Sequence, residues 1–271
     1  MSEQTHTARD RAVQRAADYL AAMLEMPDAF RGQQLRGAGP VAEFESLLAE
    51  RSGFPFCLST SNATTGLLIA ALATQLAGKE IIVPPRSWGG TYGPFEFAGA
   101  RLVWAEEDAR GNISPASIQS LSTPATTAVV AADWNGSRHD TRAVREVCDS
   151  LNLIYIEDTS FLPSPDDEPE ARSLADIQII SFGPGKPITL GEGGALLTRH
   201  RWIYERAISL SQHPERCSSE RIADCPERPL LNGRIHPVAA VLGVVLLTSV
   251  TPERNSVTRV EGAEVADRNT W

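Results

Sequence analysis

The stretch SFGPGKPITLGEGGALLT, residues 181–198, places Lys186 in a loop rich in glycine and proline between two apolar runs. We predict a strand over residues 177–182 before the loop and another over residues 195–197 after it. Because glycine and proline hold the backbone in turns, the position of Lys186 is restricted. A lysine held near an anion and apolar walls can lose its proton and bond to a carbonyl carbon. A solvated surface lysine is the ordinary alternative.

On both sides of this loop, short apolar runs alternate with longer segments of helical periodicity. The predicted strands are 56–58, 81–83, 102–104, 127–132 and 153–156, and the predicted helices are 8–26, 41–51, 63–75, 89–98, a short helix opening at Ser114-Pro115, and 141–151. This alternation predicts an α/β fold with a mainly parallel sheet covered by helices. Such sheets bind ligands at the carboxyl ends of their strands, so polar residues directly after the apolar runs are candidates for function.

Two further expectations concern the N-terminal region. In the predicted helix 8–26, the apolar face is expected to be buried, and it consists of Val13, Ala17, Leu20 and Leu24. Residues 31–39 contain glycine and arginine and are expected to form a loop.

The sequence SNATTG, residues 61–66, joins a predicted strand to a predicted helix. The N–H groups and the dipole at the start of a helix favour an anion such as phosphate, and Thr64 adds a hydroxyl donor. An Asn or Ser N-cap without any ligand explains the same residues. The segment is neither a P-loop nor a GxGxxG fingerprint, which disfavours nucleotide binding through those motifs.

Asp158 and Trp88 also follow predicted strands. A carboxylate at the Glu157-Asp158 position can hold a cationic ring nitrogen through a charge-assisted hydrogen bond, or it can be solvated in a loop. The Trp88 ring can stack on a planar cofactor, or it can pack in the core. Together, an anion site, an acid, an aromatic plate and a lysine at the strand ends of one sheet are the groups that pyridoxal 5′-phosphate (PLP) requires.

The same motifs resemble those of the DegT/DnrJ/EryC1/StrS family of PLP-dependent sugar aminotransferases, which have the aspartate aminotransferase-like fold. The resembling segments are GPVAEFESLLAERSG (39–53), STSNATTGLLIAAL (59–72), IIVPPRSWGGT (81–91), LIYIEDTS (153–160), the lysine segment 181–198, and LNGRIHPVAAVLGVVLL (231–247). The resemblance therefore implies the large domain of a PLP-dependent transferase of fold type I.

The resemblance also implies a role for each candidate residue. Lys186 is the expected catalytic residue, which carries PLP and moves the proton between the substrate and the cofactor. The expected cofactor-binding residues are Ala63, Thr64 and Ser181 at the phosphate, Trp88 on the ring face, Asp158 at the ring nitrogen, and Asn232, which reaches the phosphate of a neighbouring subunit and so implies a homodimer.

The implied activity is transfer of an amino group from an amino acid, with glutamate expected, to a keto sugar nucleotide or a similar cyclic ketone. The expected partners are these small molecules, and the expected setting is secondary metabolism or surface-polysaccharide synthesis. The family's dehydratase branch carries a histidine in place of the lysine, so the presence of Lys186 argues against that branch.

The chain departs from the family pattern at several points. The expected organisation is an N-terminal helix and loop over residues 1–40, a PLP-binding large domain over 41–250, and a short disordered tail over 251–271, with the C-terminal small domain missing. Phe161 stands where relatives usually carry Gln or His near the phenolic oxygen of PLP, and Ala63 replaces a common glycine.

These departures leave two alternatives to the leading hypothesis. In the first alternative the chain is a truncated non-catalytic PLP-binding homologue, and in the second it is a partner subunit of a full-length enzyme. A third possibility keeps the cofactor but changes the reaction to an amino-acid transformation without a sugar.

Composition and charge restrict the expected partners and location of the protein. The chain has 271 residues and a formal net charge of −9, without a basic stripe, so no nucleic-acid partner is expected. The longest apolar run is shorter than the roughly 20 residues that span a bilayer, and the N-terminus has no apolar core, so a cytoplasmic protein without membrane contact is expected. The four cysteines lack paired spacing, which disfavours both a disulfide and a metal site.

Overall fold

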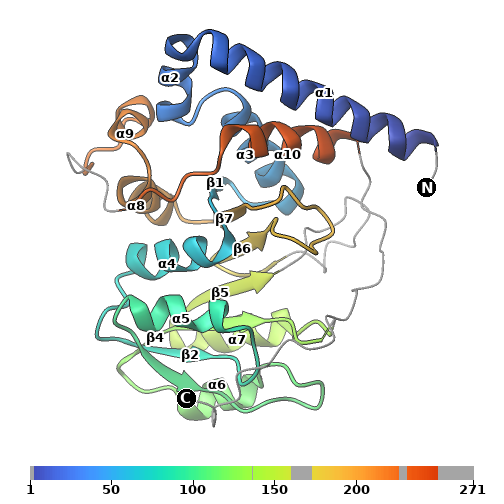
Figure 1. Ribbon diagram of the computed structural model, residues 1–271. Helices are drawn as coiled ribbons and strands as arrows, with labels where there is room; N and C mark the ends of the chain where they lie inside the picture. Colours follow the sequence, from blue (N-terminus) through green and yellow to red (C-terminus); the bar gives the residue numbers. More distant parts are fainter. Residues whose placement is uncertain (1–2, 136, 160–172, 226–230, 250–271) are drawn as a thin grey trace.

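Seven strands form one sheet between two layers of helices (Figure 1). The computed structural model describes residues 3–135, 137–159, 173–225 and 231–249. The strands are β1 (Phe56–Thr60), β2 (Glu80–Val83), β3 (Arg101–Trp104), β4 (Thr126–Ala132), β5 (Ile154–Thr159), β6 (Ile177–Ser181) and β7 (Gly194–Thr198). The helices are α1 (Glu3–Glu25), α2 (Pro27–Arg36), α3 (Pro40–Ser52), α4 (Ala63–Ala73), α5 (Gly89–Phe97), α6 (Pro115–Leu121), α7 (Thr141–Leu151), α8 (Arg201–Ser211), α9 (Pro214–Glu220) and α10 (Pro237–Ser249).

The order of the strands in the sheet is β1-β7-β6-β5-β4-β2-β3. The pairs β3–β2, β2–β4, β4–β5 and β5–β6 are parallel, whereas β7 runs antiparallel to both of its neighbours, β1 and β6. The predicted α/β class with a mainly parallel sheet is therefore confirmed. The carboxyl ends of β1, β2, β4, β5 and β6 meet at one edge, where ligands of such sheets bind.

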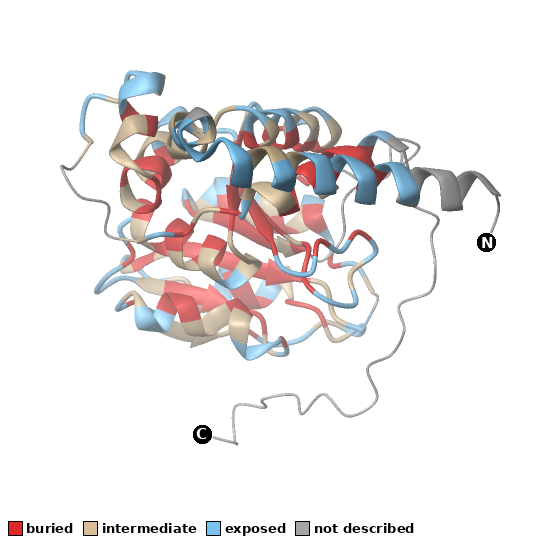
Figure 2. Cartoon of the chain, turned by 45° about the horizontal axis from the view of Figure 1, so that its top comes forward, coloured by how far each residue is buried: buried red, intermediate tan, exposed pale blue. Residues whose placement is uncertain are grey.

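Both faces of the sheet are covered, which explains why the strands are almost continuously apolar. One face packs against α4, α5 and α8 through residues such as Leu67, Phe95 and Ile208. The other face is divided between two clusters. Helices α6 and α7 cover β2, β4 and β5 there, and α3 and α10 cover β1, β7 and β6. In Figure 2 the strands are accordingly drawn as buried.

Helix α1 lies across α10, and the face turned inward adjoins the one that periodicity predicted, one residue round the helix (Figure 2). Ala12 and Ala16 are buried, whereas Val13 and Leu24 are 61% and 71% exposed. The prediction for this face is wrong because two apolar stripes run along the helix. The stripe that contains small alanines lets the two helix backbones approach more closely, and it is the one that packs. The stripe that was predicted to be buried, which consists of Val13, Ala17, Leu20 and Leu24, faces solvent.

The expected loop over residues 31–39 is also wrong, because α2 extends to Arg36. Pro27 occupies the first turn, where its missing N–H costs nothing. Gly37 ends the helix in the left-handed conformation, at φ 65°, and its N–H bonds to carbonyls of the last turn. These two terminal signals outweigh the polar, glycine-containing interior of the segment.

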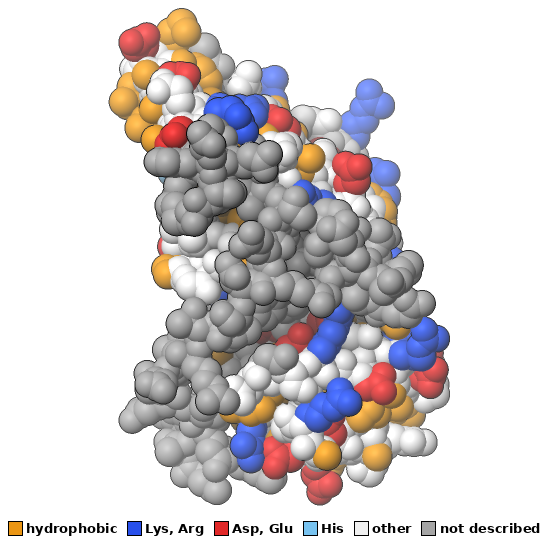
Figure 3. All heavy atoms as spheres, turned by 90° about the vertical axis from the view of Figure 1, so that its right-hand side faces the viewer, with side chains coloured by type: hydrophobic (Ala, Val, Ile, Leu, Met, Phe, Trp, Pro, Cys, Tyr) orange, Lys and Arg blue, Asp and Glu red, His pale blue; other side chains and the backbone are white. Residues whose placement is uncertain are grey.

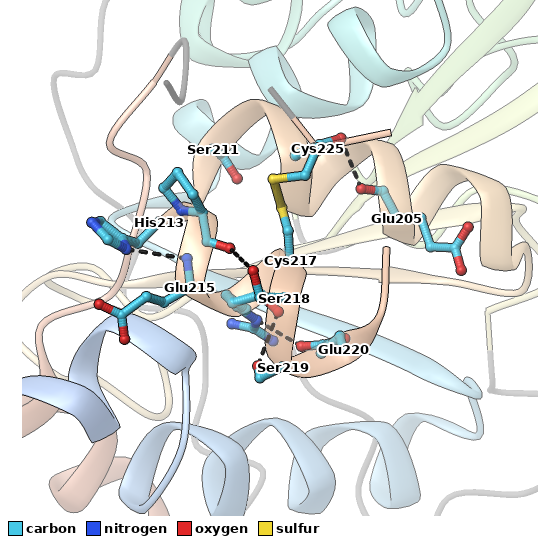
Figure 4. Close-up of a disulfide and its surroundings, with 12 residues drawn as sticks. Glu205, Ser211, His213, Glu215, Cys217, Ser218, Ser219, Glu220 and Cys225 are labelled. Atoms are coloured by element: carbon cyan, nitrogen blue, oxygen red, sulfur yellow. Dashed lines mark hydrogen bonds and ion pairs between the residues drawn. A yellow bond between two sulfur atoms is a disulfide. The ribbon is translucent and has the colours of Figure 1, made fainter. Parts of the chain in front are cut away.

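The expectation that no cysteines pair is wrong as well. Cys217 and Cys225 form a disulfide with 5.9 Å between their Cα atoms (Figure 4). The chain reverses at Arg221, which adopts the left-handed conformation after α9, so eight residues of sequence separation become a short distance in space. Cys57 and Cys148 are free and buried.

Beside this disulfide, Arg216 of α9 forms a buried ion pair with Glu45 of α3. The two pairs of atoms Nη2–Oε2 and Nη1–Oε1 lie 2.7 and 3.2 Å apart. Glu45 Oε1 also accepts hydrogen bonds from the backbone N–H and the hydroxyl of Ser59, and Arg216 Nε donates to Glu220 at 2.8 Å. The ion pair thus connects α3, α9 and the end of β1.

Among the described helices, none is both long enough and apolar enough to cross a bilayer. On the face drawn in Figure 3, the acidic and basic side chains of the described residues are interspersed. The expected tail over residues 251–271 lies outside the described residues.

Candidate active site

The turn that was predicted to bind an anion lies between β1 and α4. Asn62 is the N-cap of α4, and its side-chain oxygen accepts a hydrogen bond of 2.8 Å from the Thr65 N–H. The N–H groups of Ala63 and Thr64 belong to the first turn, so they have no acceptor within the helix. The capping alternative is therefore realised, and it leaves two backbone donors and the Thr64 hydroxyl at the sheet edge.

The lysine segment lies directly against this turn. Gly194 begins β7 and pairs both with Thr60 of β1 and with Ser181 of β6. A Cβ atom on Gly194 would lie 2.5 Å from the Ala63 nitrogen, a distance that no side chain tolerates. The glycine therefore allows the turn and the lysine loop to touch backbone to backbone.

A second segment reaches the same turn from the other side. Ser61 N–H donates to the Gly233 carbonyl at 2.8 Å, Gly233 N–H donates to the Ser211 carbonyl at 3.1 Å, and Arg234 forms a β-bridge with Thr60. Asn232 stands next to these contacts with an exposed side chain. The backbone of this segment thus supports the turn, while Asn232 faces outward.

Lys186 lies in the loop between β6 and β7. Its N–H bonds to the Gly183 carbonyl at 3.3 Å, and the base of the loop is closed by bonds between Phe182 and both Gly193 and Leu190. Burial lowers the pKa of Lys186 from its ordinary value of 10.5, and the charge of Asp158 opposes this change. Ser181, the last residue of β6, is partly buried on the face of the sheet that α4 covers.

Asp158 extends from β5 toward α5. Its Oδ2 atom accepts a hydrogen bond of 2.6 Å from the Thr91 hydroxyl. Burial raises the pKa of Asp158 from its ordinary value of 3.8, although the Thr91 hydrogen bond and the charge of Lys186 act in the opposite direction. The charges of Asp158 and Lys186 each affect the pKa of the other group, so the acid and the amine lie within electrostatic range of each other.

The neighbouring Glu157 points to the opposite face of the sheet, as strand alternation requires. It is buried there, 3.7 Å from both His139 Nε2 and Arg138 Nη2. His139 in turn contacts Asp133 and the Tyr155 hydroxyl, each at 2.6 Å. Of the Glu157-Asp158 pair, only Asp158 therefore faces Lys186.

Trp88 precedes α5 and is 69% exposed, so the alternative of a core tryptophan is wrong. Its indole ring and the Thr64 hydroxyl converge on Gly90. A Cβ atom at Gly90 would lie 2.8 Å from Trp88 Cδ1 and 2.9 Å from Thr64 Oγ1. The aromatic plate is thus beside the α4 turn and presents a solvent-accessible flat face.

The structure therefore places Asp158 within electrostatic range of Lys186, and it places Trp88 and Thr64 on two sides of Gly90. Sequence reasoning missed Thr91, which bonds to Asp158, and Gly194, which permits the close approach. No local sequence signal marks Thr91, because its contact with Asp158 depends on how α5 packs against β5. Phe161 lies outside the described residues.

The sheet order and the helices on both faces are those of the fold type I shared by PLP-dependent transferases. The model of the DegT/DnrJ/EryC1/StrS aminotransferase family matches residues 21–268, and the chain belongs to this family. The family consists of PLP-dependent enzymes, so the predictions of family, cofactor and enzyme class are confirmed at that level.

Individual relatives are sugar-nucleotide enzymes. The chain is 27% identical over 221 residues to a UDP-4-amino-4,6-dideoxy-N-acetyl-beta-L-altrosamine transaminase from Campylobacter jejuni, which covers 80% of this chain and 58% of that protein. It is 31% identical over 161 residues to a GDP-perosamine synthase from Caulobacter vibrioides, covering 58% of this chain and 43% of that protein.

A solved structure is also similar to this chain. DesI, determined in the presence of its TDP-sugar product, matches with a TM-score of 0.71 and 28% identity over 87% of this chain and 58% of that chain. The chain thus spans less than two thirds of the length of each of these relatives.

Proposed function

We propose that this protein binds PLP and transfers an amino group from an amino acid, with glutamate as the donor, to a keto sugar nucleotide. The observation that carries the proposal is the placement of two groups at the carboxyl ends of the paired strands β5 and β6. Asp158 accepts a hydrogen bond from Thr91 at the end of β5, and Lys186 lies in the loop after β6. The relatives named above support the sugar-nucleotide substrate.

The residues present fit PLP. The Thr64 and Ser181 hydroxyls and the N–H groups of Ala63 and Thr64 are donors suited to a phosphate. Asp158, partly buried and hydrogen-bonded by Thr91, is suited to a cationic ring nitrogen, and the exposed Trp88 ring is suited to a flat heterocycle.

When bound, PLP supplies an electron sink for a carbanion at the carbon that carries the amino group. Lys186 would hold the cofactor through its amine, which burial makes easier to deprotonate. With its lowered pKa the same amine would accept and return a proton at the carbon that carries the amino group. Asp158 keeps the ring nitrogen protonated by remaining ionised.

The proposal includes a homodimer. Asn232 stands exposed beside the Ser61 turn, where its side chain is available to the phosphate site of a second copy. Sedimentation of the holoprotein tests this part, and a monomer that binds PLP fully would contradict it.

The sequence allows an unusually direct test because it contains only two lysines, Lys79 and Lys186. We expect protein purified with PLP and treated with borohydride to carry the reduced cofactor on the peptide that contains Lys186. Lys186→Ala should lose the label, and Lys79→Ala, which changes an exposed lysine, should keep it. Label on Lys79 or no label at all would overturn the proposal.

Amino transfer is tested separately. The wild-type protein, given glutamate and a 4-keto sugar nucleotide, should form 2-oxoglutarate and an amino sugar in equal amounts. Labelling of Lys186 without turnover would favour a non-catalytic PLP-binding protein. Turnover with amino acids in the absence of any sugar would favour the amino-acid reaction.

A further inference from the structure

A chain of two buried hydroxyl groups leads to Asp158. Ser87 Oγ lies 2.7 Å from Thr91 Oγ1, which lies 2.6 Å from Asp158 Oδ2. Both hydroxyl residues are buried, at 7% and 3% exposure. They flank Trp88, and Thr91 N–H donates to the Trp88 carbonyl at 2.8 Å, so the turn that carries the aromatic plate also carries the chain.

The direction of the chain follows from counting protons. A carboxylate only accepts hydrogen bonds, and a hydroxyl has a single proton to donate. Thr91 therefore donates to Asp158, and its own oxygen must accept the proton of Ser87. This order binds one carboxylate oxygen of Asp158, Oδ2, from the side of α5.

We propose that Ser87 and Thr91 are positioning residues for the aminotransferase site, which hold Oδ2 of Asp158 so that its other oxygen is presented to the cationic ring nitrogen of PLP. The inference rests on the proposed function and adds to it the residues that fix the acid. Hydrogen bonds to a charged group are stronger than those between neutral groups, and here the donor is shielded from water. The same contact opposes the effect of burial on the Asp158 pKa.

The test uses holoprotein of the wild type, Thr91→Val, Thr91→Ser and Ser87→Ala. Thr91→Val keeps the shape of the side chain and removes its hydroxyl. We expect it to weaken PLP binding by about 10- to 100-fold, the range for a hydrogen bond to a charged group. It should also shift the pH dependence of the visible absorption of the bound cofactor, because the ring nitrogen loses part of its counter-charge.

Rescue distinguishes positioning from packing. Thr91→Ser restores the hydroxyl without the methyl group, and it should return PLP affinity and the absorption profile close to the wild type. Ser87→Ala touches Asp158 only through Thr91, so it should shift both in the same direction by a smaller amount. Thr127→Val, at the far end of β4, controls for the loss of a threonine hydroxyl and should change neither.

Three outcomes decide the matter. Normal PLP affinity and absorption in both Thr91→Val and Ser87→Ala, with Lys186 still labelled, would overturn the inference and leave the proposed function intact. Failure of Thr91→Ser to rescue a Thr91→Val defect would also overturn it. Absence of labelling at Lys186 in the wild type would overturn both proposals.

Discussion

Asp158 and Lys186 are both pushed by burial toward their neutral forms, and each is a counter-charge for the other. A site of this kind is costly for the empty protein and is suited to a ligand that carries a positive ring nitrogen and an aldehyde. The effect of Asp158 on the stability of the apoprotein and its effect on PLP affinity can be measured separately.

The variant Asp158→Asn separates the effect on stability from the effect on PLP affinity. The raised pKa means that folded apoprotein holds the Asp158 proton more tightly than the unfolded chain does, so the contribution of this residue to stability falls as pH rises above its ordinary value of 3.8. We expect the apo Asn variant to melt at or above the wild-type temperature at pH 7, with the difference shrinking below pH 4. PLP affinity should fall at least about tenfold. A variant that melts lower at neutral pH would contradict this.

Lys186 should titrate below the ordinary value of a lysine, 10.5. Reductive methylation of the apoprotein at a series of pH values, mapped by mass spectrometry, gives a midpoint for each lysine regardless of how fast it reacts. Burial lowers the pKa of Lys186, so its midpoint should lie below 10.5. In Asp158→Asn the Lys186 midpoint should fall further, because the carboxylate raises it. An unchanged midpoint in that variant would show that the two groups do not interact.

At the scale of single elements, the sequence predicted the strands and the central helices well, because burial on both faces and clear end signals act locally. Ser114 caps α6 before Pro115, and α7 spans Thr141–Leu151, both as predicted. The inward face of α1 depended on α10, a partner more than 200 residues away in the chain. Periodicity identifies apolar stripes, but only the packing partner selects between them.

The candidate site divides in the same way. That Asp158, Lys186, Trp88 and Thr64 lie toward one edge of the sheet could be predicted, because each lies in or a few residues after an apolar strand, while their roles stay predictions. Thr91 could not be predicted, since its role depends on the distance between α5 and β5 rather than on any local pattern.

The ion pair between Arg216 and Glu45 connects helix α9 to α3. Arg216→Met tests how much this pair contributes to the unfolding free energy. The substitution leaves Glu45 buried with only the two donors of Ser59, and breaking a buried pair in this way costs about 3–5 kcal/mol of unfolding free energy. Arg15→Met is the matched control, since it breaks an exposed pair with Glu43 on the same helix, α3, and should cost at most about 1 kcal/mol. Urea unfolding of both variants gives the comparison, and equal losses would contradict the assigned role of the buried pair.

For the molecule as a whole, the disulfide between Cys217 and Cys225 closes a short loop next to this ion pair (Figure 4). Closing a loop of that size restricts the unfolded chain by about 2 kcal/mol in the chain-entropy account. We expect Cys225→Ser to lower the melting temperature by a few degrees, and the variant should no longer respond to dithiothreitol. Wild-type protein that melts at the same temperature with and without reductant, after its thiols have been shown to be free, would refute the contribution.

The pairing of these cysteines could not be read from their spacing. It requires the chain to reverse at Arg221 in a left-handed conformation, which that residue type seldom adopts. The mainly parallel architecture, by contrast, follows from the alternation of elements along the whole chain, because short connections leave few other arrangements.

The backbone contact at Gly194 has a practical consequence for anyone who redesigns this protein. Residues 61–64 and 183–194 are more than 100 positions apart in the sequence, yet they form one continuous surface. Substitutions in contact combine non-additively. Directed evolution should therefore randomise both stretches in a single library, because libraries that mutate one stretch at a time do not sample pairs of substitutions that are beneficial only together.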